Sequence, residues 1–218
     1  MSAHLEPRPP ETPRERLIEA TITEIERHGL SQLTVRAVAA AADMNIAAVN
    51  YHFRSKQALV AAALEASILH MLEDTDAILA RLPEAPEAVL GELLGYYLEG
   101  CLRFPRISKA HLHDGFVADD YSGFFPQRFA PVLERLRVAL CAVRPALGSE
   151  LAARRVIAAL SAVFFPAFFA PLFQCFGALD TPLRRSEYAL ELARQALAPA
   201  DAAGAGGARR PARARRRK

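Results

Sequence analysis

The stretch NIAAVNYHFRSKQAL, residues 45–59, concentrates side chains that can hydrogen-bond to a polar or anionic partner. Asn50 offers both a donor and an acceptor, and Tyr51 and His52 carry groups that can donate. Lys56 adds a positive charge shortly afterwards. Amide and aromatic groups at the start of a short helix are poor choices for a protein core. We therefore expect this stretch to contact something outside its own domain.

A second group of polar side chains, His111-Leu112-His113-Asp114, raises the question of a metal site. On a helix His111 and His113 point about 200° apart, so they share a metal only if the segment is extended. We therefore predict hydrogen-bonded or ligand-facing histidines and no metal. The chain also has no Ser-His-Asp order, paired-carboxylate motif or glycine-rich phosphate loop. Neither an enzyme nor a bound cofactor is expected.

The composition is that of an ordinary globular protein, with 218 residues, 52% hydrophobic and 23% charged. Its cysteines, Cys101, Cys141 and Cys175, lie far apart in apolar stretches and show no ligand spacing. They are predicted to be buried, reduced thiols of a cytoplasmic protein.

Both ends of the chain differ from its middle. Residues 1–12 are expected to be flexible, and they lack the apolar core of a signal peptide. The tail 199–218 contains six Arg and one Lys against one Asp, and is predicted to be disordered. It suits either a sequence-independent contact with a polyanion or a solubilising role.

One uncharged stretch, Val156 to Leu179, is long enough to span a membrane. Pro166 and Pro171 are expected to break a helix in its interior, which argues against a span. Helices that are apolar all round also occur in protein cores and at dimer interfaces. We favour the dimer interface and expect no membrane contact.

Apolar residues recur with helical spacing along the whole chain, and no run of alternating β-branched residues predicts a strand. The fold class is therefore all-α: a three-helix head followed by a larger helical bundle. Helices are expected over 13–28, over VRAVAAAA after Thr34, over 46–53, from Lys56 to before Pro83, and over 86–103, 106–117, 125–143, 149–175 and 182–197.

The second and third of these helices have the spacing of a helix-turn-helix motif. Ala39 is small where the next helix must cross closely, and Asp43 occupies the position in the turn that needs a left-handed backbone. With Val49 and Phe53 directed inward, the opposite face of the third helix is exposed. The apolar anchors of the motif are Val38, Ala42, Met44 and Val49.

An exposed face of this kind suits the major groove of DNA. Small alanines permit close approach and can meet thymine methyl groups, whereas polar tips reach base edges or phosphates. Lys56 lies at a helix N-terminus, where the dipole favours anions. The candidate DNA contacts are Thr34, Arg36, Asn45, Ala47, Ala48, Asn50, Tyr51, His52 and Lys56. The alternative for Tyr51 and for His52 is a packed core aromatic.

The stretch RERLIEATITEIERHGLSQLTVRAVAAAADMNIAAVNYHFRSKQAL resembles the DNA-binding domain of the TetR family of transcriptional regulators. The resemblance implies an Ω-shaped homodimer that binds a palindromic operator in double-stranded DNA. Residues 13–56 would form the DNA-binding domain, and 57–198 the ligand-binding and dimerisation domain. The chain departs from the family pattern at Asp43, usually Gly, and at Asn50, usually Tyr.

The resemblance also implies a function: a ligand-responsive regulator, most often a repressor, that a small effector releases from DNA. The Asn-Tyr-His-Phe variant is similar to a subset that includes fatty-acid-responsive members, which suggests a largely apolar, fatty-acyl-like effector. An effector in the bundle would pivot the long fourth helix and change the separation of the two heads.

Segments 149–175 and 182–197 are predicted to dimerise. Alanines in the first permit close helix approach, and its phenylalanines, at 164, 165, 168 and 169, supply large apolar surfaces. In the second, Leu183, Leu190, Ala193 and Leu197 form one stripe.

Two other kinds of function stay open at this stage. One is a helical small-molecule-binding protein whose head does not bind DNA. The other is a membrane-surface protein held by residues 156–179 and the basic tail.

Overall fold

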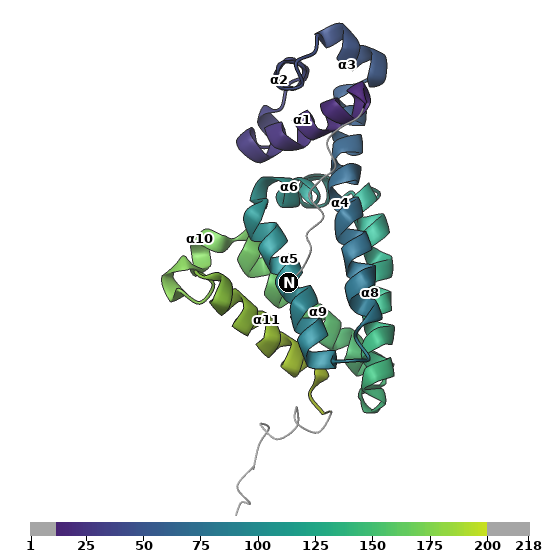
Figure 1. The fold of residues 1–218 in the computed structure, drawn as a ribbon, viewed down its shortest axis with the longest axis vertical. Coiled ribbons are helices and arrows are strands. Elements are labelled where there is room, and N and C mark those ends of the chain that lie inside the picture. The colour runs from purple at the N-terminus through teal and green to yellow at the C-terminus, as the bar shows by residue number, and fades with distance from the viewer. Residues whose placement is uncertain (1–11, 200–218) are drawn as a thin grey trace, which may run out of the picture.

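The computed structural model describes residues 12–199 as a set of helices, without a strand in that range (Figure 1). The predicted all-α fold is therefore confirmed. The head consists of α1 (Pro13–His28), the 3₁₀ turn η1 (Leu30–Gln32), α2 (Val35–Ala41) and α3 (Ile46–His52). The other elements are α4 (Lys56–Ala80), α5 (Pro86–Arg103), α6 (Pro105–Ala110), α7 (His113–Ala118), α8 (Phe124–Val143), η2 (Pro145–Leu147), α9 (Gly148–Phe168), α10 (Ala170–Phe173), η3 (Gln174–Phe176) and α11 (Pro182–Leu197).

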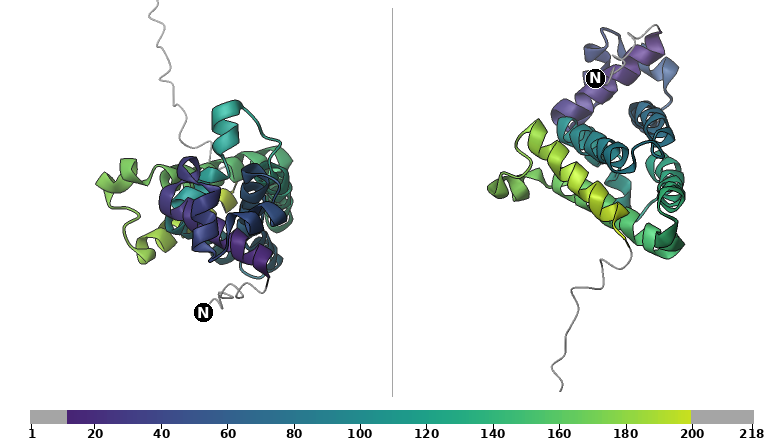
Figure 2. Two further views of the ribbon diagram at one scale, coloured as in Figure 1. Left: turned by 90° about the horizontal axis from the view of Figure 1, so that it is seen from above. Right: turned by 60° about the horizontal axis from the view of Figure 1, so that its bottom comes forward.

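The flexible N-terminus predicted over 1–12 and the disordered tail predicted over 199–218 lie outside the described residues, apart from Thr12 and Pro199. Between them the head stands at one end of the bundle, and α4 runs from one to the other (Figure 1). The segment formed by α10 and η3 projects to one side of the bundle in each view (Figure 2).

Signals in the sequence start and end the first helix. Thr12 Oγ1 accepts the N–H of Glu15 at 3.2 Å, and Glu15 Oε2 accepts the N–H of Thr12 at 3.1 Å. This reciprocal pair is a capping box. Gly29 ends α1 at a φ of 84°, a conformation that costs glycine little.

The head has a hydrophobic core of its own, separate from that of the bundle. We call it the head core; its buried members include Leu17, Ile25, Val38, Val49, Phe53 and Leu59. Ile107 and Ala110 of α6 are also buried in it, although α6 follows the bundle helix α5 in sequence. The short helix α6 therefore packs beneath α1 (Figure 1) and is part of the head–bundle junction.

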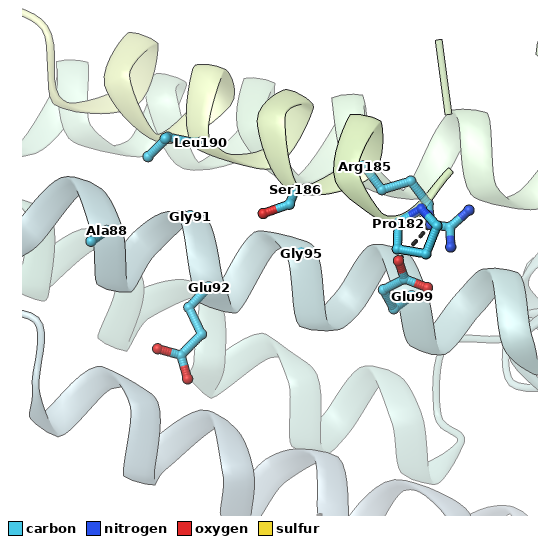
Figure 3. Close-up of a pocket in the computed structure, with 9 residues that line it drawn as sticks. All are labelled: Ala88, Gly91, Glu92, Gly95, Glu99, Pro182, Arg185, Ser186 and Leu190. Atoms are coloured by element: carbon cyan, nitrogen blue, oxygen red, sulfur yellow. Dashed lines mark hydrogen bonds and ion pairs between the residues drawn. The ribbon is translucent and has the colours of Figure 1, made fainter. Parts of the chain in front are cut away.

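The bundle core is formed by α5, α8, α9 and α11, together with the later part of α4. Its most buried members include Leu93, Leu94, Leu98, Val132, Leu140, Val163, Ala193 and Leu197. The closest helix pair is α5 with α11, because glycines on α5 face α11 (Figure 3). A Cβ atom on Gly91 would lie 3.2 Å from Cα of Leu190, and one on Gly95 would lie 3.6 Å from Cβ of Ala189.

The single long helix predicted over 149–175 is confirmed as far as Phe168 and is wrong after it. α9 ends at Phe168, because Phe169 leaves the helical region with φ −115° and ψ 35°. Pro171 then lies at the second position of the short helix α10, and Gly177 ends η3 with a positive φ of 62°. Pro166, expected to break the helix, instead lies inside α9 with its ring buried. The carbonyl oxygen of Ala162, which the missing N–H of Pro166 leaves free, instead accepts the hydroxyl of Tyr188 at 2.8 Å.

The segment predicted as one helix over 106–117 is two. α6 ends at Ala110, and a turn at His111 and Leu112 leads into α7, which ends in a left-handed Asp119 at φ 52°. Two of the four phenylalanines predicted for the dimer interface, Phe164 and Phe168, instead face the bundle. Phe164 stacks with rings of the bundle interior, and so does Phe168.

The leucine stripe predicted on α11 is divided between two environments. Ala193 and Leu197 are buried in the bundle core, whereas Leu183 is exposed at the start of the helix.

The prediction that all three cysteine thiols are buried is also wrong. Cys101 and Cys141 are partly buried, and Cys175 is exposed because η3 projects from the bundle.

One helix within the described range is long and apolar enough to cross a membrane, judged by length and composition: Pro145–Phe168, which comprises η2 and α9. In the fold this helix packs against α5, α8 and α11. Val156, Leu160 and Val163 on its inner face belong to the bundle core, as in the core helix of a globular protein.

Candidate nucleic-acid interface

The helix-turn-helix motif has the geometry that its sequence predicts. Asp43 adopts a left-handed conformation with a φ of 53°, which a short polar side chain tolerates better than most. The N–H of the next residue, Met44, donates to the carbonyl oxygen of Ala39 at 2.8 Å. Ala39 itself is buried at the point where α2 and α3 meet. The turn therefore holds α3 at a fixed angle to α2.

Opposite faces of α3 have opposite environments. Val49 is 2% exposed, and Phe53, the residue after the helix, is 5% exposed, which confirms their inward direction. Tyr51, in contrast, is 84% exposed. The exposed residues on and next to α3 are Asn45, Ile46, Ala47, Asn50 and Tyr51. Because the inner residues belong to the head core, the outer face is presented as a rigid surface.

Tyr51 is not the packed core aromatic that the sequence left open. Its ring lies edge-on to that of His52, with centroids 5.1 Å apart and planes at 82°. His52 is half-buried, so part of its imidazole faces solvent beside Tyr51. The pair places a hydroxyl and an imidazole at the C-terminal end of α3.

Three candidate helix caps surround this face. Thr34 Oγ1 accepts the N–H of Ala37 at 3.1 Å at the start of α2, and Asn45 Oδ1 accepts the N–H of Ala48 at 2.7 Å at the start of α3. Ser55 does the same for Ala58 at 3.0 Å at the start of α4. Thr34 and Asn45 thus have structural roles as N-caps. The Asn45 side-chain NH₂ group remains available as a donor.

Positive charge lies near the ends of these helices. Lys56, half-buried, occupies the first position of the 25-residue helix α4. Arg36 is exposed in the first turn of α2. Between residues 29 and 56 the chain has three basic residues and one acidic residue, although residues 1–56 have seven of each. The acidic residues are concentrated on α1, so α2, α3 and the start of α4 present a locally basic surface.

Two residues that sequence reasoning did not select also lie at this surface. Ile46 is 42% exposed at the first position of α3, an apolar side chain between Asn45 and Ala47. Arg14 of α1 places its guanidinium carbon 5.2 Å from the ring centroid of Phe53. Ile46 could be recognised from its place directly after a capping Asn, whereas Arg14 could not, because its contact joins distant parts of the chain.

The two histidines considered for a metal have separate environments. His111 Nε2 lies 3.0 Å from the Ser67 hydroxyl, and its ring packs on Phe125 with centroids 5.4 Å apart. His113 pairs with the carboxylate of Asp114 at 3.0 Å. Burial lowers the pKa of His111 to about 4, so it is neutral at physiological pH. In the described part of the chain, no cluster of three or more such side chains can hold a metal ion.

A groove of about 410 Å³ lies between α5 and α11, above the two glycines (Figure 3). Charged residues at its rim are already paired: Arg185 with Glu99, and Arg81 with Glu92 at 2.7 Å. Gly91 and Gly95 allow α11 to lie close to α5, and the groove lies along this contact. We therefore regard it as a consequence of helix packing.

Residues 17–63 match the family described as bacterial regulatory proteins, tetR family. The head belongs to the TetR family. The match covers the whole helix-turn-helix motif and the first part of α4. A comparison with curated protein sequences gave no match.

Solved structures extend the similarity beyond the head. A member of the TetR family from Streptomyces coelicolor A3 is 25% identical, with a TM-score of 0.60 over 86% of this chain and 98% of that one. The multidrug binding protein EbrR, complexed with malachite green, is also 25% identical, with a TM-score of 0.58 over 86% and 98% of the two chains. A TetR transcription regulator from Haloarcula marismortui, at 20% identity and a TM-score of 0.62 over 85% and 96%, shares the fold.

Together the TetR head and the TetR-like fold identify a DNA-binding transcriptional regulator. The family match independently supports the predicted class of protein. It also agrees with the exposed polar face of α3, because a helix that served only to pack in the head core would not need such a face.

Proposed function

We propose that the chain acts in the cytoplasm as a homodimeric repressor that inserts α3 of each subunit into the major groove of a palindromic operator. The observation that carries this proposal is the contrast along α3. Asn50 is exposed and Tyr51 is 84% exposed, whereas the preceding residue, Val49, is 2% exposed in the head core. A rigid helix with a buried apolar face and an exposed face of amide, aromatic and small side chains is what a recognition helix presents to the major groove.

Each side chain then has a role that its chemistry permits. Ala47 and Ala48 allow the helix to approach the base edges, and Ile46 adds an apolar surface for a thymine methyl group. Asn50 can read a base edge, because its amide both donates and accepts. The remaining candidates would contact phosphates: Thr34, Arg36, Asn45, Tyr51, His52 and Lys56.

The homodimer would form through α9 and α11, which lie side by side. Ile157 is 65% exposed and Phe165 is 54% exposed on the outer face of α9, a spacing that places them on one stripe. Phe169, Leu172 and Phe176 continue this apolar surface onto the projecting segment of α10 and η3. A surface of this kind is typical of a protein–protein interface. In a twofold dimer the same surface of each subunit would be buried against its partner.

A small, largely apolar effector would bind in the bundle among a series of packed rings. We call this series the aromatic cluster: Tyr97, Phe125, Phe129, Phe164 and Phe168. Its polar groups are few, and the hydroxyl of Tyr97 is already paired with that of Thr75 at 2.8 Å. This environment favours an apolar ligand such as a fatty-acyl chain. The ligand-bound form of the structurally similar EbrR supports a ligand-binding role for the bundle.

Two elements would carry the response to the head. α4 contributes Leu59 to the head core and Ile78 to the bundle core. α6 has Ile107 and Ala110 in the head core, and the next residue, His111, packs on Phe125 of the aromatic cluster. An effector that separates these rings would move α6 and α4 and so shift the head. Because half-sites lie about one DNA turn apart, a small shift releases one head of a dimer.

The proposal is tested with the full chain and duplex DNA. Selection from a random-sequence duplex library, followed by footprinting, should recover a palindrome whose half-sites lie about 10 base pairs apart. Substitution of Asn50 or Tyr51 by alanine should abolish the footprint without unfolding the head. If the chain enriched no sequence and bound only ligands, it would be a helical small-molecule-binding protein without DNA binding, the alternative that the sequence allowed.

A further inference from the structure

We infer that Arg14, in the first turn of α1, binds a DNA phosphate next to the end of α3, so that the DNA interface continues onto α1. This role presupposes the proposed function, because it requires the head to bind duplex DNA. The contact of Arg14 with Phe53 carries it: the guanidinium carbon lies 5.2 Å from the centroid of the ring.

The position of Phe53 determines where this guanidinium lies. Phe53 follows the last residue of α3 with an extended backbone, φ −136° and ψ 120°. Ser55 then caps α4, and Lys56 is its first residue. A group stacked on Phe53 is therefore beside the junction between α3 and α4, and Figure 1 shows the start of α1 at this junction. Lys56 and Arg14 approach it from two different helices.

The chemistry of the contact leaves the phosphate-binding groups free. The attraction between a guanidinium and an aromatic ring is electrostatic, so it needs none of the N–H donors. Those donors form a fork that matches the oxygens of a phosphate. Arg14 is exposed, and within residues 12–199 it is paired with no carboxylate. The contact with Phe53 restricts the positions that the side chain can take, which lowers the entropy lost on binding.

Other arginines of α1 do not share this arrangement. Arg16 is also exposed, but two residues along a helix it points about 200° away from Arg14. Arg27, at the opposite end of α1, lies 4.0 Å from Glu24. Arg14 and Arg16 therefore have the same charge and are both exposed. They differ in position, because Arg14 lies next to Phe53.

The test is the salt dependence of DNA binding by the full-length protein. Wild type and the variants Arg14→Gln, Arg14→Lys and Arg16→Gln are titrated at several KCl concentrations with two duplexes. One duplex is selected by the wild type from a random library, and the other is a scrambled version of it. Each phosphate contact contributes about 0.9 to the slope of log Kobs against log salt, so a dimer that lacks two contacts should lose about 1.8. Circular dichroism verifies that every variant is folded.

We expect Arg14→Gln to reduce the slope and to weaken binding to both duplexes by the same factor, because phosphates carry no sequence information. Arg14→Lys should keep the wild-type slope, and so should Arg16→Gln. An unchanged slope in Arg14→Gln, an equal loss in Arg16→Gln, or an equal loss in Arg14→Lys would each overturn this role of Arg14. If the wild type itself showed no salt-dependent binding, the proposed function would be wrong, which is a distinct result.

Discussion

Glu26 of α1 and Arg106 of α6 cap each other's helices across the junction between head and bundle. The Glu26 carboxylate accepts the N–H of Arg106 at 3.1 Å and that of Ile107 at 2.9 Å, at the start of α6. In return the Arg106 guanidinium donates to the carbonyl oxygens of Glu26, at 3.1 Å, and of Arg27, at the end of α1. Each charge lies at the helix terminus whose dipole it favours. This pair fixes α6 to α1.

Removal of the Glu26 carboxylate should loosen the head. Glu26→Ala leaves two N–H groups of α6 without their acceptor, which by analogy with helix caps costs about 1 kcal/mol. In a chain of this size we expect the Tm to fall by about 2–4 °C in a thermal melt. Glu19→Ala, at an exposed position of the same helix, is the matched control and should leave the Tm unchanged. Equal melting of the two variants would contradict the role of the pair.

Asn45 allows capping and DNA binding to be separated. Asn45→Ala loses the hydrogen bond to the N–H of Ala48 and should destabilise the head by about 1 kcal/mol. Asn45→Asp keeps a good cap and hence the stability, but places a negative charge beside the DNA phosphates. We expect its affinity for a selected duplex to fall roughly tenfold or more, because the new carboxylate would repel the DNA phosphates. Urea unfolding and fluorescence anisotropy measure the two effects, and full affinity in Asn45→Asp would exclude a phosphate near this residue.

Tyr51 and Val49 should respond in opposite ways. Tyr51→Ala removes an exposed side chain, so the free energy of unfolding should change by no more than about 0.5 kcal/mol, while DNA affinity decreases. Val49→Ala creates a cavity in the head core and should destabilise it by about 2 kcal/mol. Parallel urea titrations and DNA titrations of both variants provide the comparison. Loss of stability in Tyr51→Ala would show that the ring packs within the fold.

The proposed dimer surface can be tested with one charge. Phe165→Lys places an ammonium group on the exposed stripe of α9, where a partner would bury it. Sedimentation velocity should show monomers at concentrations at which the wild type is dimeric. Val138→Lys, at an exposed apolar position of α8, is the control and should leave the assembly unchanged. A Phe165→Lys protein that sediments like the wild type would place the interface elsewhere.

His111 should make the stability of the chain sensitive to acid. Burial lowers its pKa from 6.5 to about 4, so the unfolded chain takes up a proton at a pH where the folded chain does not. The stability due to this group is therefore complete above about 6.5 and is lost as the pH falls towards about 4, on the order of 3 kcal/mol in total. His111→Gln should flatten the pH dependence of the unfolding free energy in this window. A His111→Gln protein whose unfolding free energy depends on pH as steeply as that of the wild type would contradict this role of His111.

Local patterns predicted the head well. The capping Thr34, the inward Val49 and the left-handed Asp43 each depend on a few consecutive residues, and the structure confirms the geometry of all three. The family match likewise confirms the class of protein. Whether the named residues contact DNA stays a prediction.

Errors occur where distant contacts or loop geometry decide. The exposure of Cys175 follows from the break at Phe169, and that break has no strong local signal besides the prolines. The contacts of Glu26 with α6 and of Arg14 with Phe53 join segments that are remote in sequence or on different helices, so periodicity cannot reveal them. The orientations of Phe164 and Phe165, neighbours with opposite environments, depend on which side of α9 faces the bundle.

The close approach of α5 and α11 has a mechanical consequence. At Gly91 no side chain of α5 separates its backbone from that of Leu190 on α11, so we expect these two helices to move together as one stiff plate. If α11 lies in the dimer seam, that plate is the fixed frame of the whole assembly. Only α4 and α6 would then move relative to this frame. The separation of the two heads would change while the dimer interface stayed in place.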